Sequence, residues 1–159
     1  MNWATQFTLL FLLFFTQSVA LADADSDIDF IVSASKPPLG VVFEIVEGNE
    51  KALELALNRI NQYSARLKKA IPAIKLAVVS HGTEQFALLK ENKTQHKKAH
   101  KKVQSLMSDD VPVHVCGTHA SWYSLSEDDF PSYVDVTEAG PAKIKEYQRK
   151  GYALVIVDV

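Results

Sequence analysis

Five short runs rich in β-branched and other apolar residues alternate with long connecting segments, and this spacing constrains the fold more than any other feature of the sequence. The runs cover residues 41–46, 74–80, 111–116, 133–136 and 152–159. Each connection has about a dozen residues or more, as a parallel crossover requires, and no Asn-Gly or Asp-Gly hairpin signal occurs. We therefore predict an α/β fold, a three-layer sandwich around about five mostly parallel strands.

The connecting segments carry helical patterns. Residues 49–67 place apolar side chains on one helical stripe, and Asn49 is a suitable N-cap for that helix. Gly140-Pro141 opens a last helix, since proline is favoured in the first turn, and Gly151 closes it. Two more helical segments are expected over residues 83–91 and 94–107.

The N-terminal segment has the layout of a secretory signal peptide. It has no charged side chain before Asp23, an apolar run from Leu9 to Phe15, and an A-x-A pattern that ends at Ala22. We therefore expect cleavage after Ala22 and export to the periplasm. An uncleaved membrane anchor is the alternative, but polar residues 16–18 interrupt the apolar stretch before it reaches the about 20 residues that a span needs.

The rest of the chain is expected to form one domain preceded by an arm. Residues 23–40 mix acidic and small residues with prolines, and we interpret them as an N-terminal arm with a short edge strand at Phe30–Val32. Residues 41–159 then form the α/β domain, because the chain is long enough for one hydrophobic core and too short for two. No segment after the signal peptide is long and apolar enough to span a membrane.

The charge balance and the missing motifs exclude several classes of function. The chain has 17 basic and 19 acidic residues, so its overall charge does not indicate nucleic acid binding. It has no Gly-rich phosphate loop, no dinucleotide-binding fingerprint and no G-x-S-x-G elbow. We therefore do not expect a P-loop, Rossmann or serine-hydrolase function, and we expect no cofactor.

Cys116, in "VHVCGTHASW", is the only cysteine of the chain. Because it cannot form an internal disulfide, in an exported protein it suggests a reactive thiol, an intermolecular bond or a metal ligand, while a small buried apolar side chain is its ordinary role. It ends a predicted strand, and ligands gather at the carboxyl ends of parallel strands. The residues at the ends of the other strands are Glu47, His81 and Thr137.

Two histidines are candidates to activate this thiol. A free thiol is mostly protonated at neutral pH, and a positively charged imidazole of His119 or His81 within about 5 Å would favour the reactive thiolate. A helix that starts in "GTHASW", with Thr118 as its N-cap, would add to this effect. His114 lies further back along the strand, so we expect it to be structural. We therefore predict Cys116, His119 and His81 as catalytic residues.

Metal binding is an alternative at the same residues. Cys116, His119 and His81 would offer Zn or Cu three ligands and leave one position open. His96 and His100 have the i, i+4 spacing that can bind a metal on a helix face. They fall at the border of the buried stripe among several lysines, so the ordinary interpretation of this helix is a solvated basic face.

Four segments in a fixed order carry a resemblance to a known family. They are "VVFEIVEGNEKALELALNRINQY", "IKLAVVSHGTEQFALL", "VPVHVCGTH" and "SYVDVTEAGPAKIKEYQRKGYALVIV". The most specific pieces are the strand-end "SHG", the "VHVCG" strand end and the closing "GPAKIKEYQRKGYA". From about Val41 onward the chain resembles the DsrE/DsrF-like sulfur-relay family. The resemblance implies a flavodoxin-like fold, homo-oligomers and, in sulfur-relay members, a cysteine that carries persulfide sulfur between proteins, for which Cys116 is the corresponding position.

The sequence therefore predicts an exported, thiol-based carrier of persulfide sulfur, at most a sulfurtransferase-like protein. A carrier needs only one cysteine, whereas a disulfide oxidoreductase usually needs a second. The expected partners are further copies of the chain and a sulfur donor or acceptor, either a protein or a small sulfur compound, with no nucleic acid and no membrane after cleavage. The alternative is a non-enzymatic binding or assembly module for a small ligand or a Zn or Cu ion, in which Cys116 only lines the pocket.

Overall fold

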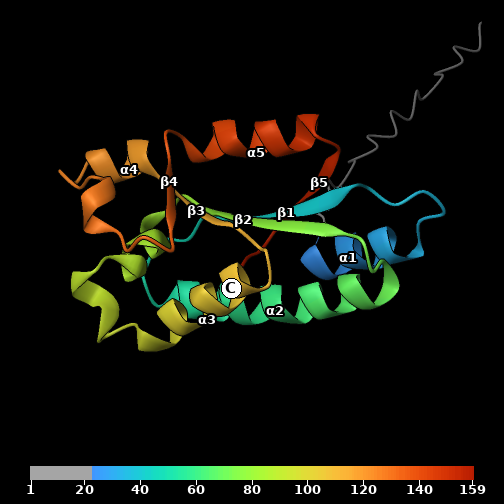
Figure 1. Ribbon diagram of the computed structural model, residues 1–159, viewed down its shortest axis with the longest axis horizontal. Helices are drawn as coiled ribbons and strands as arrows, with labels where there is room; N and C mark the ends of the chain where they lie inside the picture. The colour runs from blue at the N-terminus through green and yellow to red at the C-terminus, as the bar shows by residue number, and fades with distance from the viewer. Residues whose placement is uncertain (1–22) are drawn as a thin grey trace, which may run out of the picture.

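The computed structural model describes residues 23–159, so the expected signal peptide, residues 1–22, lies outside the described residues. The described chain forms a five-stranded sheet with helices on both faces (Figure 1). The strands are β1 (Gly40–Ile45), β2 (Lys75–Ser80), β3 (Val113–Cys116), β4 (Asp135–Thr137) and β5 (Tyr152–Ile156). Every neighbouring pair is parallel, in the order β4-β3-β2-β1-β5. The predicted α/β fold is confirmed.

The helices form the two outer layers of the predicted sandwich. One face of the sheet carries α1 (Ala24–Ser33), α2 (Ala52–Ala70) and α3 (Lys97–Ser108), and the other carries α5 (Gly140–Arg149) (Figure 1). The short helix α4 (Gly117–Ser121) follows β3, and 3-10 turns form η1 (Thr83–Leu88), η2 (Glu91–Lys93) and η3 (Glu127–Asp129). Among residues 23–159 no helix combines the length and the apolar character that a membrane crossing requires.

The strand register places the ends of three strands side by side at the carboxyl edge of the sheet. Ile45 of β1 is opposite Ser80 of β2, and Ser80 is opposite Val115 of β3. Because the strands are parallel, the chain leaves all three at the same edge. The residues that follow are Val46, His81 and Cys116.

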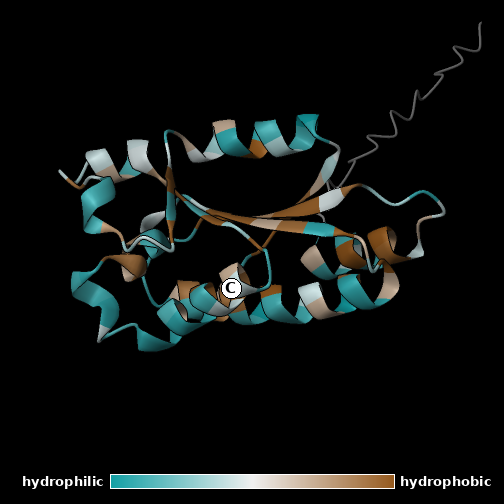
Figure 2. Ribbon diagram, in the orientation of Figure 1, coloured by the Kyte–Doolittle hydropathy of each residue, from teal (hydrophilic) through white to brown (hydrophobic). Residues whose placement is uncertain are grey.

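The hydrophobic core lies mainly between the sheet and the layer of α1, α2 and α3. Side chains of β1 alternate between the two faces, so Phe43 and Ile45 belong to this large cluster, whereas Val42 belongs to a smaller one beneath α5 with Ile144. Figure 2 shows the apolar strands between the more polar outer surfaces of the helices. Burial on both faces explains why the strand sequences are almost continuously apolar.

The segment interpreted as an arm contains a helix, and the edge strand predicted at Phe30–Val32 is wrong. These residues belong to α1, in which Ile28 and Ile31 are buried in the large core cluster. Their spacing of three residues puts both side chains on one helical face. Asp25 forms an ion pair with Arg66 of α2, which holds α1 against its neighbour. Ser26, Asp29 and Ser33 are exposed on the opposite side of this amphipathic helix.

The predicted start of α5 is confirmed, whereas α2 starts at Ala52, with Lys51 rather than the predicted Asn49 as its N-cap. The side chain of Asn49 accepts a hydrogen bond from the backbone N–H of Ala52, with an Oδ1–N distance of 3.2 Å. Helix α5 starts at Gly140 with proline in its first turn, and Gly151 follows its last turn with a φ of 87°. Glycine is favoured at that position because a positive φ is strained for other residues.

Candidate functional site

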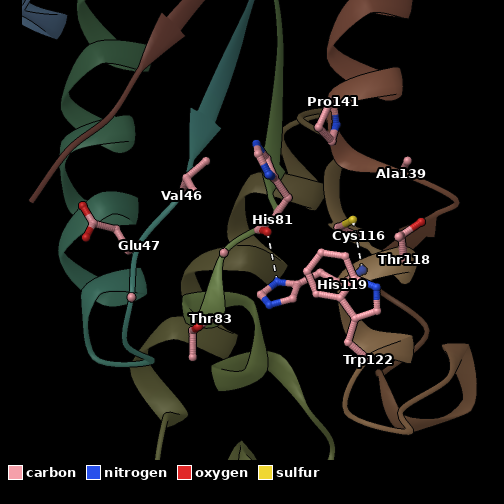
Figure 3. Close-up of a pocket in the computed structure, with 12 residues that line it drawn as sticks. Val46, Glu47, His81, Thr83, Cys116, Thr118, His119, Trp122, Ala139 and Pro141 are labelled. Carbon is pink, nitrogen blue, oxygen red and sulfur yellow. Dashed lines mark hydrogen bonds between the residues drawn. The ribbon is translucent and has the colours of Figure 1, made fainter.

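A cavity of about 500 Å³ opens at the carboxyl edge of the sheet, where the loops after β1, β2 and β3 meet the start of α5 (Figure 3). It is lined by Val46, Glu47, Gly48, His81, Gly82, Thr83, Cys116, Thr118, His119, Trp122, Ala139 and Pro141. The cavity therefore brings together the three predicted site residues, and Glu47 joins them. Thr137, which also ends a strand, does not line it.

Cys116 ends β3 and caps the helix that follows. Its side chain is 5% exposed, and its Sγ accepts a hydrogen bond from the backbone N–H of His119 at 3.4 Å. Thr118, the predicted N-cap, instead donates its hydroxyl to the carbonyl of Glu138 at 2.7 Å. The cap is one place where the sequence interpretation was wrong, because the helix starts two residues earlier than expected. The consequence is a main-chain donor directed at the sulfur, which suits a thiolate.

Gln85 is a site residue that the sequence analysis missed. Its fully buried carboxamide accepts a hydrogen bond from the Cys116 backbone N–H, with an Oε1–N distance of 2.7 Å, and donates to the Cys116 carbonyl at 3.4 Å. The Gln85 side chain, which comes from η1, therefore satisfies the backbone N–H and C=O groups at the end of β3, as a neighbouring strand would. The sequence signal that could have identified Gln85 is a polar residue directly before the apolar run "FALL", because a polar side chain that is buried needs hydrogen-bond partners.

The imidazole of His119 is held in place by its own contacts. Its Nδ1 lies 3.0 Å from the carbonyl oxygen of His81 and 3.3 Å from Nε2 of Gln85. The carbonyl can only accept, so we assign the proton to Nδ1, and Nε2 is then the basic nitrogen. Phe86 and Trp122 pack against the ring, with centroid distances of 5.2 and 5.3 Å. These contacts fix the orientation of the ring.

His81 pairs with a carboxylate that the sequence analysis did not single out. Its Nε2 lies 2.7 Å from Oε1 of Glu44, and both side chains are mostly buried. Glu44 is on β1, which lies beside β2, and His81 directly follows β2, so the pair depends on strand order, which the sequence did not reveal. Gly140 lets the start of α5 close over His81, because a Cβ there would lie 2.6 Å from the His81 Cβ.

A buried carboxylate joins the loops that form the wall of the cavity. Glu84 accepts hydrogen bonds from the Ser80 hydroxyl at 2.7 Å, the Gly82 N–H at 3.0 Å and the Glu47 N–H at 2.7 Å. These donors come from the ends of β1 and β2. A side chain at position 82 would come within 2.6 Å of the Glu47 backbone nitrogen and oxygen. The wall is therefore tightly packed and preorganised.

His114 lies outside the cavity, in a network beneath α5. Its Nδ1 hydrogen-bonds Asp135, and its Nε2 lies 2.8 Å from the hydroxyl of Tyr147. Burial lowers the pKa of His114, although the hydrogen bond to Asp135 opposes this shift. Burial also raises the pKa of Tyr147 to about 12. The contacts agree with the structural role expected for His114.

The histidine pair of α3 is less exposed than the sequence suggested. His100 is 2% exposed, and its Nδ1 lies 2.6 Å from the hydroxyl of Tyr133. Its Nε2 has no hydrogen-bond partner among the described residues, and burial lowers the pKa of the imidazole. His96, at the N-cap of α3, pairs with Glu50 at 2.9 Å. The two imidazoles thus bind different partners, Tyr133 and Glu50, and the lysines of the helix form the solvated basic face.

The comparison with protein families decides how this chain is classified. Residues 41–156 match the family described as DsrE/DsrF-like. The chain belongs to this family. The predicted membership of the DsrE/DsrF-like family is therefore confirmed, and the match covers every strand of this DsrE/DsrF-like protein except the first residue of β1.

Solved structures of two proteins share the fold of this DsrE/DsrF-like protein. MTH1491 of Methanobacterium thermoautotrophicum, described as a protein of unknown function, has a TM-score of 0.59 and 22% identity, over 73% of this chain and 96% of that one. The ychN protein of E. coli has a TM-score of 0.57 and 14% identity, over 74% of this chain and 98% of that one. At these identities the likeness shows the fold alone. No protein with a curated description matches the chain.

Proposed function

We propose that this protein carries sulfane sulfur as a persulfide on Cys116. The observation that carries the proposal is the position of the thiol: it ends β3, accepts a hydrogen bond from the His119 N–H of α4 and lines the cavity at the carboxyl edge of the sheet. Membership of the DsrE/DsrF-like family supports this role, because the resemblance to its sulfur-relay members implies a persulfide-carrying cysteine at the position of Cys116. A lone cysteine suffices, since the sulfur it receives is passed on rather than resolved as a disulfide.

Loading is a displacement at sulfur. The Cys116 thiolate attacks the outer sulfur of a protonated persulfide donor, R–S–S–H. A bond forms between Sγ and that sulfur, the donor's S–S bond breaks, and its electron pair leaves on R–S⁻. The proton that Cys116 loses balances the one that R–S⁻ takes up, so the exchange requires no oxidant or reductant.

Each of the surrounding groups would have a different role in this exchange. The backbone N–H of His119 hydrogen-bonds the sulfur and favours its anionic form. The His119 ring, held through Nδ1, can exchange a proton with the leaving thiolate through Nε2. His81 and Glu44 form a pair of opposite charges, or a neutral pair, at the wall of the cavity. Gln85 positions the Cys116 backbone.

The low exposure of Cys116 favours a second candidate function, a binding or assembly module. The imidazoles of His81 and His119 already have partners other than the sulfur. Within residues 23–159, no group of three or more His, Cys, Asp or Glu side chains is arranged to hold a metal. A small ligand is therefore the better supported form of this alternative, with Cys116 only lining its cavity.

Intact-mass spectrometry separates the two functions. The purified protein is incubated with a persulfide donor and weighed before and after reduction. A carrier gains about 32 Da, the mass of one sulfur atom, loses it on reduction, and shows no gain as the Cys116→Ser variant. A protein that never gains this mass, and whose thiol reacts with iodoacetamide no faster than the same thiol in unfolded protein, is a binding module instead.

We also propose that the protein is exported and forms homo-oligomers. The signal-peptide layout of residues 1–22 supports export, and the family resemblance supports self-association. Protein recovered from the periplasm of the expressing cell should start at Asp23, and light scattering should give a mass above that of one chain. A periplasmic protein that keeps residues 1–22 would contradict the cleavage, and a monomer at all concentrations would contradict the assembly.

A further inference from the structure

The cavity at Cys116 is poor in positive charge, which bears on the donor it can accept. Among residues 23–159, no Lys or Arg side chain lines it. The imidazole of His81 is paired with the Glu44 carboxylate, and Glu47 adds a second carboxylate whose Oε1 accepts a hydrogen bond from the Val159 N–H at 2.9 Å. Sites for compact anions normally supply Arg, Lys or several directed N–H donors. An inorganic dianion such as thiosulfate would find no Lys or Arg to bind here, and the His81 imidazole is already paired with Glu44.

The rim of the same cavity is apolar and exposed. Trp122, which follows α4, is 74% exposed, and Val46, which follows β1, is 53% exposed. The two side chains line the cavity from opposite sides (Figure 3). Pro141 and Ala139 extend this apolar lining at the start of α5. Large apolar side chains that stay exposed around a cavity commonly bind apolar groups of a ligand.

We infer that the sulfur donor is a small organic persulfide whose apolar carbon group lies against Trp122 and Val46 while its outer sulfur reaches Cys116. This inference rests on the proposed persulfide chemistry and adds the class of substrate. The 5% exposure of Cys116 requires a slender donor, because a flat protein surface cannot reach the sulfur. A cavity of about 500 Å³ holds a molecule of that size. The indole face of Trp122 suits an aromatic carbon group in particular.

The test compares loading rates of Cys116 by three donors. Benzyl persulfide and methyl persulfide, each released in situ from a protected precursor, and thiosulfate are offered separately to the purified protein. The gain of about 32 Da is followed by intact-mass spectrometry, and each rate is divided by the rate at which the same donor loads free N-acetylcysteine. This division removes the intrinsic reactivity of the donor.

The expected order is benzyl persulfide first, methyl persulfide about tenfold slower and thiosulfate slowest, since burial of the aromatic group adds binding that the other donors lack. Trp122→Ala should lower the ratio of the benzyl rate to the methyl rate about tenfold, because the methyl donor lacks the aromatic group that Trp122 would contact. Tyr123→Ala is the matched control, because Tyr123 is the adjacent exposed aromatic residue but does not line the cavity. It should keep the wild-type preference.

The outcomes distinguish this inference from the proposed function. Equal normalised rates for the three donors, or thiosulfate as the fastest, overturn the substrate class while sulfur carriage on Cys116 stands. The same result follows if Trp122→Ala and Tyr123→Ala lose the benzyl preference equally. If none of the three donors loads Cys116, both the carrier function and the inference are wrong.

Discussion

Replacing Gln85 by leucine should lower the free energy of unfolding by about 2 kcal/mol. The substitution leaves the Cys116 N–H, now bonded to Gln85 at 2.7 Å, without an acceptor in the interior, which costs about 1–3 kcal/mol. Loss of the longer bond to the Cys116 carbonyl, at 3.4 Å, adds less than about 1 kcal/mol. The apolar leucine side chain returns about 1 kcal/mol through its burial. The net change corresponds to an increase of about 30-fold in the unfolding equilibrium constant.

Urea denaturation followed by far-UV circular dichroism measures this change, with an unchanged slope m as the sign that the two states remain the same. Gln148→Leu is the control, because Gln148 is exposed on α5 and its replacement should alter stability by no more than about 0.5 kcal/mol. If Gln85→Leu is as stable as Gln148→Leu, the hydrogen bonds of Gln85 do not hold the end of β3 and the reasoning is refuted. Persulfide loading of Cys116 should also slow in Gln85→Leu, since its backbone is no longer fixed.

Two further predictions concern the packing of the cavity wall and the buried histidines. Gly82→Ala should lower the free energy of unfolding by about 1–3 kcal/mol, measured in a thermal or urea melt, because its Cβ would overlap the Glu47 backbone. Gly48→Ala is the control and should change stability far less, because a Cβ there meets nothing within 4 Å. Equal losses of stability in the two variants would count against the packing argument. Burial lowers the pKa of His100 and of His114, so below about pH 6.5 the unfolded chain binds more protons than the native one. The free energy of unfolding should therefore fall as the pH drops through this value, and His100→Gln should weaken the fall; a variant with the wild-type pH profile would show that His100 does not contribute.

The layers of the fold could be predicted because they depend on patterns that are local in the sequence. A strand buried on both faces needs a continuous apolar run, and a parallel crossover needs a long connection, so both features are visible without knowing the partners. The exception is α1. Its helical repeat consists of Ile28 and Ile31 alone, and it was not recognised among acidic residues, small residues and nearby prolines. The burial of these two isoleucines depends on packing against the rest of the fold.

The candidate site could be predicted only in part, for a different reason. Cys116, His81 and His119 were found because each stands at or just after a strand end. Their partners were missed because Glu44 and Gln85 acquire a role only through strand order and through the fold of η1, which brings residues 31 or more positions apart into contact. The hydrogen bond at the sulfur comes from the backbone of His119, and residue type does not indicate such a contact.

The N-cap position of Cys116 gives the protein an internal reporter. The sulfur that is open to chemistry is also the acceptor for the His119 amide, so any adduct on the thiol alters the electronic environment of one particular N–H. The amide resonance of His119 in a ¹⁵N-correlated NMR spectrum should therefore shift when Cys116 is loaded and return when it is unloaded. Occupancy of the thiol can then be followed continuously, without a chemical probe on the sulfur and without removing the protein from the reaction.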